Sequence, residues 1–268
     1  MTITNTDILC VNRKLKDQSP DINQDTFIQE FALGCGGKIL SWQEAREHDN
    51  TYVLWGARSI KQVKEAEANN RDYYYIDNGY FGNYPQKKFF RIIRNATHDT
   101  RPILDRPDDR LKMANIKIKP FTKGSRIIVA PPSPKSFTLW DIDQPKWIED
   151  TVNELKRYTD RPITVRNKRT RKERLYHDTI QEDLADDCHC LVTYNSVAAV
   201  EALIEGKPVI TLGPNAATHL ATHKLSDVED IKIPTEEERG AWLRHLAYSQ
   251  FTHQEMINGT AWRILNGR

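Results

Sequence analysis

The sequence has few of the features that mark secreted, membrane-bound or repetitive proteins. Its 268 residues include only four cysteines, too few to serve as a disulfide framework in a chain this long. No apolar run approaches the length needed to span a bilayer. The first residues also lack the charged-then-apolar pattern of a signal peptide. We therefore expect a cytoplasmic protein that does not interact with membranes.

The sequence also lacks a large excess of charge of either sign, because the formal net charge is only +2. This value excludes a histone-like polycation. Internal repeats and low-complexity segments are absent. The hydrophobic content of 38% and the length suit two domains with modest cores.

Metal ligands at useful spacing are scarce as well. Cys188, His189 and Cys190 are consecutive, but in a strand the imidazole would point away from the two thiols. The other two cysteines are isolated, so no second pair stands at zinc spacing. We predict no metal site.

Strand-like and helix-like segments alternate along the whole chain, which predicts an α/β fold. A basic connection at 112–124, broken by proline and glycine, separates the two halves. The predicted strands are 7–11, 51–56, 72–76, 89–93, 126–130, 162–165, 190–193 and 209–212. The predicted helices are 25–33, 59–69, 146–158, 179–184, 197–204, 235–250 and 252–265.

The most informative segment runs from Leu191 to Ala217 and predicts a strand, a tight turn, a helix and a second strand. Ser196 stands where the helix begins, and such a terminus after a parallel strand binds anions. Glu201 lies one turn further, within reach of the sugar hydroxyls of a nucleotide. An ordinary strand–helix–strand crossover, in which Ser196 is only a cap, would explain the same residues.

The segment resembles the donor-binding half of GT-B glycosyltransferases. It is most similar to the capsular-polysaccharide and phage-type enzymes, which carry an N-S-…-E-A-L-…-G-K-P-V-I element. This resemblance implies that Ser196 holds the donor diphosphate, with Tyr194 and Asn195 beside it, and that Glu201 binds the ribose.

The resemblance also implies the architecture. GT-B enzymes have two Rossmann-like domains with a cleft between them and a C-terminal helix that crosses back to the first domain. The final LAYSQFTHQEMINGTAW is similar to the same transferases. We predict an acceptor-binding domain at 1–122, a donor-binding domain at 123–250 and a returning helix at 251–268.

Glycosyl transfer needs a base, and we predict Asp77 for this role. It follows a predicted strand, where ligands approach α/β sheets, and its Asp-x-Gly-Tyr-Phe sequence resembles the family's acidic turn. An Asp-Asn-Gly turn chosen for its backbone preferences would explain the same letters.

Further donor-binding residues follow two other predicted strands. Ser133 lies in the Ala-Pro-Pro-Ser-Pro loop, and the resemblance assigns phosphate binding to Arg166 and Lys168. The basic run continues through 169–174, where a solvated loop explains the charges equally well. GT-B enzymes usually need no divalent metal, so the expected cofactor is a nucleotide-sugar alone, with a UDP-sugar the first choice.

Basic and aromatic residues interleave near Asp77, which favours a nucleic-acid acceptor. The predicted acceptor-binding residues are Tyr80, Phe81, Lys87, Lys88 and Arg91. We therefore predict a glycosyltransferase that modifies 5-hydroxymethylcytosine in double-stranded phage DNA in the host cytoplasm. The nucleobase would be flipped out of the duplex, and the sugar would be transferred by an inverting displacement that a catalytic base assists. The alternatives are a surface or capsular polysaccharide transferase with a glycan acceptor, a non-catalytic nucleotide- or DNA-binding protein, and a nucleotide-sugar epimerase.

Overall fold

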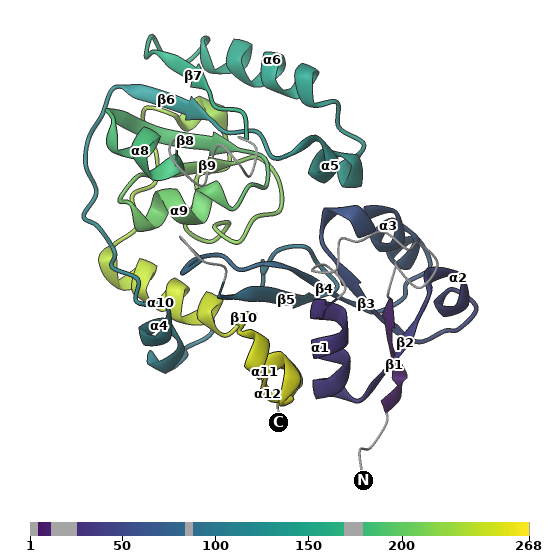
Figure 1. Cartoon of the computed structure of the whole chain (residues 1–268). Helices are drawn as coiled ribbons and strands as arrows, with labels where there is room; N and C mark the ends of the chain where they lie inside the picture. The colour runs from purple at the N-terminus through teal and green to yellow at the C-terminus, as the bar shows by residue number, and fades with distance from the viewer. Residues whose placement is uncertain (1–4, 12–25, 84–87, 169–178, 268) are drawn as a thin grey trace. The chain divides into compact units, whose positions relative to one another are not determined.

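The computed structural model describes residues 5–11, 26–83, 88–168 and 179–267, and the chain divides into two compact units (Figure 1). Unit 1 combines Met1–Thr97 with Tyr248–Arg268, and unit 2 comprises His98–Ala247. The first stretch of unit 1 therefore ends earlier than the predicted boundary at residue 122, and the chain returns to unit 1 at Tyr248.

Unit 1 contains a six-stranded sheet in the order β10-β5-β4-β3-β1-β2. Its strands are β1 (Asn5–Val11), β2 (Gly37–Leu40), β3 (Thr51–Trp55), β4 (Tyr73–Asn78), β5 (Phe90–Arg94) and β10 (Gln250–Phe251). The strands β2, β1, β3 and β4 are parallel, whereas β5 runs antiparallel to β4 and β10. The sequence predicted a wholly parallel sheet. No helix separates β4 from β5 among the described residues, and a short connection without a crossover joins antiparallel neighbours.

Helices cover both faces of this sheet (Figure 1). They are α1 (Thr26–Cys35), α2 (Trp42–Ala45), α3 (Ile60–Ala68), α11 (His253–Ile257) and α12 (Thr260–Leu265), with a 3-10 turn, η2, at Ala57–Ser59. Alternate strand residues such as Cys10, Val53 and Ile76 form one apolar cluster with residues of α1, α11 and α12. The C-terminal helices thus complete the core of unit 1.

Unit 2 is built on a four-stranded, fully parallel sheet in the order β7-β6-β8-β9. The strands are β6 (Arg126–Val129), β7 (Ile163–Val165), β8 (Cys188–Thr193) and β9 (Val209–Thr211). The helices and 3-10 turns are α4 (Asp109–Ala114), α5 (Pro134–Phe137), η3 (Thr138–Trp140), α6 (Gln144–Leu155), α8 (Ile180–Ala185), α9 (Ala198–Ile204), η4 (Leu225–Asp227) and α10 (Glu236–Ala247). The alternation predicted from the sequence is confirmed here.

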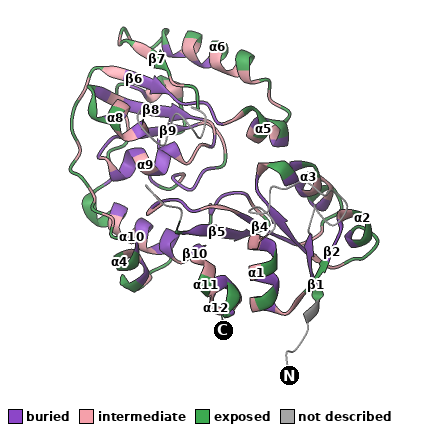
Figure 2. Cartoon of the chain, in the orientation of Figure 1, coloured by how far each residue is buried: buried purple, intermediate pink, exposed green. Residues whose placement is uncertain are grey.

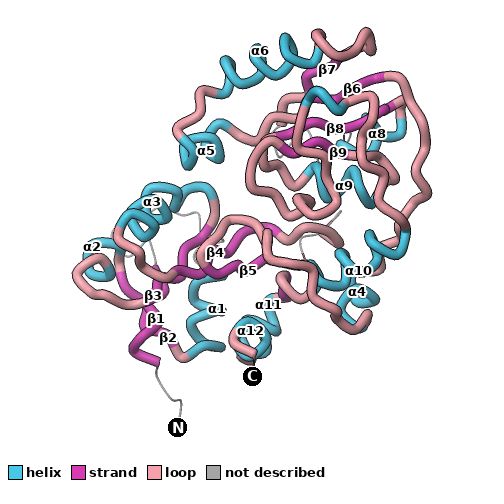
Figure 3. The backbone as a smooth tube through the Cα atoms, turned by 180° about the vertical axis from the view of Figure 1, so that it is seen from behind, coloured by secondary structure: helices cyan, strands magenta, loops and turns pink. Residues whose placement is uncertain are grey.

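The two faces of this second sheet are covered by different helices, as the view from behind also shows (Figure 3). Val129, Val192 and Ile210 point to one face and pack with Leu155 of α6. On the other side α9, whose residues are nearly all buried, packs against β8 and β9. Figure 2 shows the strands of both units largely buried beneath more exposed helices. In the part of the chain that the structure describes, none of the helices has the length and apolarity to cross a membrane.

Candidate functional site

The carboxyl edge of the unit 2 sheet brings the predicted donor-binding residues together. The ends of its strands are in register, because Val129 is paired with Val165 and Val192, and Thr193 is paired with Thr211. Since all four strands are parallel, the loops that follow them leave from the same edge. Ser133 follows β6, Arg166 and Lys168 follow β7, and Tyr194, Asn195 and Ser196 follow β8. This edge is the candidate donor site.

The turn between β8 and α9 is held by its own polar groups. The hydroxyl of Thr193 donates to the carbonyl of Ala130 (2.6 Å) and accepts from the backbone N–H of Ser196 (3.3 Å). Ser196 Oγ accepts from the N–H of Ala198 (3.2 Å), and Ser196 lies one position before the N-cap of α9, which is Val197 and makes no side-chain cap. Ser196 thus holds the turn at the start of the helix without being its N-cap, and phosphate binding by the same residue stays a prediction.

Sequence reasoning missed Asn215, which anchors this turn from the loop after β9. Asn215 is fully buried, and its side-chain amide donates to the carbonyl of Ser196 (2.9 Å). Asn195 is buried too, and its Oδ1 has no hydrogen-bond partner within the described part of the chain. A buried acceptor left in this state is costly, so a donor group from a bound molecule would be favoured there.

An aromatic cluster surrounds Tyr194 beside the turn. Its ring lies 5.7 Å from Phe137, 6.1 Å from Trp140 and 6.4 Å from Trp147, measured between ring centroids. Burial raises the pKa of Tyr194, so its hydroxyl stays protonated. The three partners come from α5, η3 and α6, and the aromatic spacing after the Ser133 loop was the signal that could have predicted them.

Gly213 leaves the room that the Tyr194 ring occupies. A Cβ at this position would lie 2.5 Å from the ring. We expect Gly213→Ala to displace Tyr194 and weaken nucleotide binding about tenfold, which is about 1.4 kcal/mol. Isothermal titration calorimetry measures this change. Gly240→Ala, where the nearest atom lies 3.5 Å away, is the control, and equal affinities of the two variants would contradict the expectation.

Two predicted donor residues are tied to α8. Arg166 forms an ion pair with Asp183, and its backbone N–H donates to the carbonyl of Val129 (2.8 Å). Glu201 is half-buried rather than fully enclosed, and its Oε1 accepts from Gln181 (3.4 Å). Lys168 is exposed. The edge therefore combines two cationic side chains with one acidic side chain, and their binding of a nucleotide stays a prediction.

The predicted base Asp77 lies within β4 rather than in a turn after it. It pairs with Arg91 of β5 in the strand register, and its Oδ2 is 3.1 Å from the guanidinium. Oδ2 also accepts from the hydroxyl of Tyr75 (3.2 Å), and Oδ1 accepts from the N–H of Asn78 (2.7 Å). The side chain is 21% exposed. Asp77 is thus held in one orientation with limited access to solvent.

The guanidinium of Arg91 binds the carboxylate of Asp77 and does not lie on an open surface. It is buried, and it also donates to the carbonyls of Asn78 (2.7 Å) and Thr97 (3.0 Å). Burial alone would lower the pKa of Arg91, but Asp77 and the hydroxyls of Tyr80 and Tyr75 raise it above its ordinary value. A guanidinium committed in this way is not free to track a phosphate backbone, contrary to the expectation for a nucleic-acid surface.

The predicted acceptor aromatics are buried as well. Tyr80 is 1% exposed and Phe81 is 5% exposed, and both backbone N–H groups donate to the Oε1 of Gln250 in β10. Rings enclosed to this degree present no face for stacking a flipped base. Lys88 is exposed, and Lys87 lies outside the described residues, as does the basic run 169–174.

The Cys-His-Cys sequence follows the strand alternation. Cys188 and Cys190 are buried, while His189 Nε2 lies 2.9 Å from the carbonyl of Val228. Burial raises the pKa of Cys188 to about 11 and that of Cys190 further, so both stay protonated thiols. No group of potential metal ligands occurs in the described ranges.

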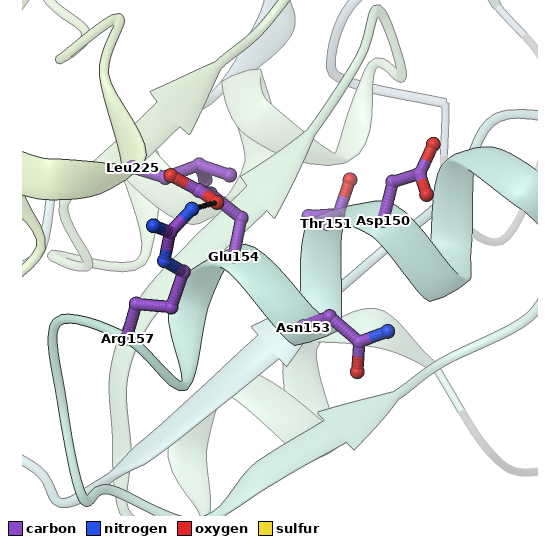
Figure 4. Close-up of a pocket in the computed structure, with 6 residues that line it drawn as sticks. All are labelled: Asp150, Thr151, Asn153, Glu154, Arg157 and Leu225. Atoms are coloured by element: carbon purple, nitrogen blue, oxygen red, sulfur yellow. Dashed lines mark hydrogen bonds and ion pairs between the residues drawn. The ribbon is translucent and has the colours of Figure 1, made fainter.

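A surface depression of about 520 Å³ lies elsewhere in unit 2 (Figure 4). Its lining comes from the second half of α6 and from Leu225, and it includes the ion pair of Glu154 with Arg157 (2.9 Å). Because α6 ends shortly before β7 begins, this end of the helix lies toward the amino edge of the sheet. The depression is therefore separate from the candidate donor site.

Comparison with known proteins identifies the fold but no sequence family. No family model matches the chain, and no curated protein matches it in sequence. Two solved structures from Thermosulfurimonas dismutans KpsC are similar in fold, each with 13% sequence identity. The beta Kdo 2,7 transferase has a TM-score of 0.52 and aligns over 97% of this chain and 98% of its own. The beta Kdo 2,4 transferase has a TM-score of 0.50, with 91% of each chain covered.

Proposed function

We propose that this chain is a glycosyltransferase of the GT-B type that moves a sugar from a nucleotide-sugar to a glycan acceptor of a capsular or related surface polysaccharide. The observation that carries the proposal is the similarity in fold to two Kdo transferases over nearly the whole of both chains. The gathering of the predicted donor residues at one sheet edge supports it independently.

In the donor half, the proposed phosphate site is the turn at Ser196 together with Ser133, Arg166 and Lys168. Arg166, whose Nε pairs with Asp183, is proposed to contact the diphosphate through its guanidinium. Glu201 is proposed to bind the ribose. The nucleobase of the donor is proposed to lie next to the aromatic cluster. There Tyr194 offers an aromatic ring and Asn195 offers a hydrogen-bond acceptor.

The acceptor half is proposed to lie at the carboxyl edge of unit 1, with Asp77 as the base. As the acceptor oxygen bonds to the anomeric carbon and the carbon–phosphate-oxygen bond breaks, Asp77 takes the hydroxyl proton. The electron pair of the broken bond leaves with the nucleotide. Arg91 keeps the carboxylate oriented for this step.

A glycan replaces DNA as the proposed acceptor. The two structures of similar fold are Kdo transferases. The burial of Tyr80, Phe81 and Arg91 removes most of the surface on which the DNA prediction depended. Kdo, an acidic sugar, is accordingly the first candidate for the transferred group, and this extends the donor choice beyond UDP-sugars.

The test is mass spectrometry of acceptors incubated with the protein and one donor at a time. The donors are CMP-Kdo and a panel of UDP-sugars, and the acceptors are Kdo-terminated oligosaccharides and DNA containing 5-hydroxymethylcytosine. We expect a one-sugar mass gain on an oligosaccharide. A gain on the DNA base alone would restore the DNA assignment. Nucleotide binding without any transfer would instead indicate a binding protein, and isomerised free sugar without an acceptor would indicate an epimerase.

A further inference from the structure

Unit 1 holds an oriented imidazole that none of the predicted site residues includes. His253 is the first residue of α11, and its Nδ1 lies 2.6 Å from the Oε2 of Glu30 in α1. The imidazole stacks on Phe27 at 5.1 Å and meets the edge of Phe90 at 4.8 Å, between ring centroids. Three contacts from two elements, α1 and β5, therefore fix its position.

The strand directions place this imidazole at the same sheet edge as Asp77. β10 is antiparallel to β5, and β5 is antiparallel to β4, so β10 and β4 run in the same direction. Phe90 is paired both with Asn78, next to Asp77, and with Phe251, two residues before His253. His253 thus follows the carboxyl end of β10, at the edge where open α/β sheets bind ligands.

The hydrogen bond to Glu30 decides which ring nitrogen is available. A carboxylate only accepts hydrogen bonds, so Nδ1 carries a proton, and in the neutral imidazole this tautomer leaves the lone pair on Nε2. None of the described residues is bonded to Nε2, and the side chain of His253 is 44% exposed whereas that of Glu30 is 13% exposed. The pair therefore presents one oriented acceptor to its surroundings.

Structural needs do not account for this pair. Thr252 and Glu255 already form the capping box of α11, so His253 is not required to begin the helix. The pair is also not needed to hold α1 against α11, because the backbones of the two helices already pack closely where Gly34 faces Met256. A single partly exposed hydrogen bond between an imidazole and a carboxylate contributes only modestly to stability.

We propose that Glu30 and His253 form a subsite that binds a sugar hydroxyl of the acceptor, which donates its hydrogen bond to Nε2. The half-buried ring of Phe27 supplies an apolar surface beside it, and small-molecule sites combine apolar surface with a few placed polar groups. Glu30 is a positioning residue, because it acts through the imidazole. This inference rests on the proposed glycosyl transfer and names a substrate contact for it.

Steady-state kinetics of His253→Phe test the subsite, since phenylalanine keeps a ring for stacking but removes both nitrogens. We expect the KM for the acceptor to rise about tenfold, as loss of one hydrogen bond predicts, while kcat and the donor KM change little. Glu30→Gln still accepts from Nδ1 and should raise the acceptor KM less. His48→Phe, at an exposed histidine of the same unit, is the matched control.

A second measurement does not depend on turnover. Titrating the oligosaccharide acceptor into the donor-free protein should shift the NMR signals of the His253 imidazole in the parent protein. An unchanged acceptor KM in His253→Phe, with the parent active, would overturn the subsite alone. A parent protein without transfer on any acceptor would overturn the proposed function, and unshifted imidazole signals at saturating acceptor would then overturn the subsite as well.

Discussion

Replacing Gly34 with alanine is expected to lower the free energy of unfolding of unit 1 by about 2 to 4 kcal/mol. In an ordinary helix this change would stabilise by up to about 1 kcal/mol, because alanine is the better helix former. Here a Cβ would lie 1.8 Å from the carbonyl oxygen of Met256 and 2.9 Å from the backbone nitrogen of Gly259. Both neighbours are backbone atoms, so α11 itself has to move.

Urea unfolding, followed by the fluorescence of the unit 1 tryptophans, measures this loss. Gly240→Ala in α10 is the control, because its new Cβ meets only the end of the Arg244 side chain at 3.5 Å. We expect that variant to be unchanged or slightly more stable. Gly259→Ala should be destabilising like Gly34→Ala, since Gly259 has a φ of 78° and an added Cβ would lie 2.7 Å from the carbonyl oxygen of Gly34. Equal stability of all three variants would show that α1 and α11 are not closely packed.

Asp77→Asn is expected to reduce transfer by about 10²- to 10⁴-fold, the range that a positioned base contributes. The amide keeps the shape of the carboxylate and the hydrogen bonds accepted by one of its oxygens, but it cannot take the acceptor proton. Nucleotide affinity should not change, because the proposed donor residues belong to unit 2. The two quantities are measured separately, as kcat with saturating acceptor and as a calorimetric Kd for the nucleotide.

The control for Asp77→Asn is the same substitution at Asp72, whose carboxylate pairs with Arg94 (2.5 Å) on the surface of unit 1. Asp72→Asn should leave transfer unchanged. Asp77→Asn also removes the charge opposite the buried Arg91, so a thermal melt must accompany the kinetics. Full activity of Asp77→Asn in a folded protein would rule out the base and leave Asp77 as the partner of Arg91.

Local sequence patterns predicted most of the elements, and the misses have physical reasons. The four strands of unit 2 are short apolar runs with clear turn signals, and all were predicted. The strand β2 was missed because Gly37–Leu40 has only one buried residue and no alternation. The helix α2 had a usable signal, the capping box of Ser41 and Glu44, but it is only four residues long.

Long-range pairing was harder to predict than local structure. Gln250 was placed at the end of a helix, yet α10 ends at Ala247 and Gln250 pairs with Arg91 in the sheet. Its buried side chain then accepts from the N–H groups of Tyr80 and Phe81, more than 160 residues earlier. The partners of Asp77 depend on the antiparallel pairing of β5, which composition does not reveal.

The donor side of the site was more accessible to sequence reasoning than the acceptor side. Ser133, Arg166 and Ser196 each lie in the loop that follows a strand, and parallel strands bring such loops to one edge. In unit 1, by contrast, His253 lies at the same sheet edge as Asp77 only because the segment Gln250–Phe251 joins the sheet as β10. No spacing in the sequence connects Glu30 with His253.

The discontinuous make-up of unit 1 has a consequence for biosynthesis. Residues 98–247 emerge from the ribosome as one uninterrupted stretch, so unit 2 can fold while unit 1 still lacks β10, α11 and α12. During the roughly 10 to 30 s needed to translate that stretch, Phe31 and Phe90 have no cover from Phe251 and Met256. The nascent first part of unit 1 therefore exposes an apolar face that chaperones can bind, and this face is covered once the segment with β10, α11 and α12 has been synthesised.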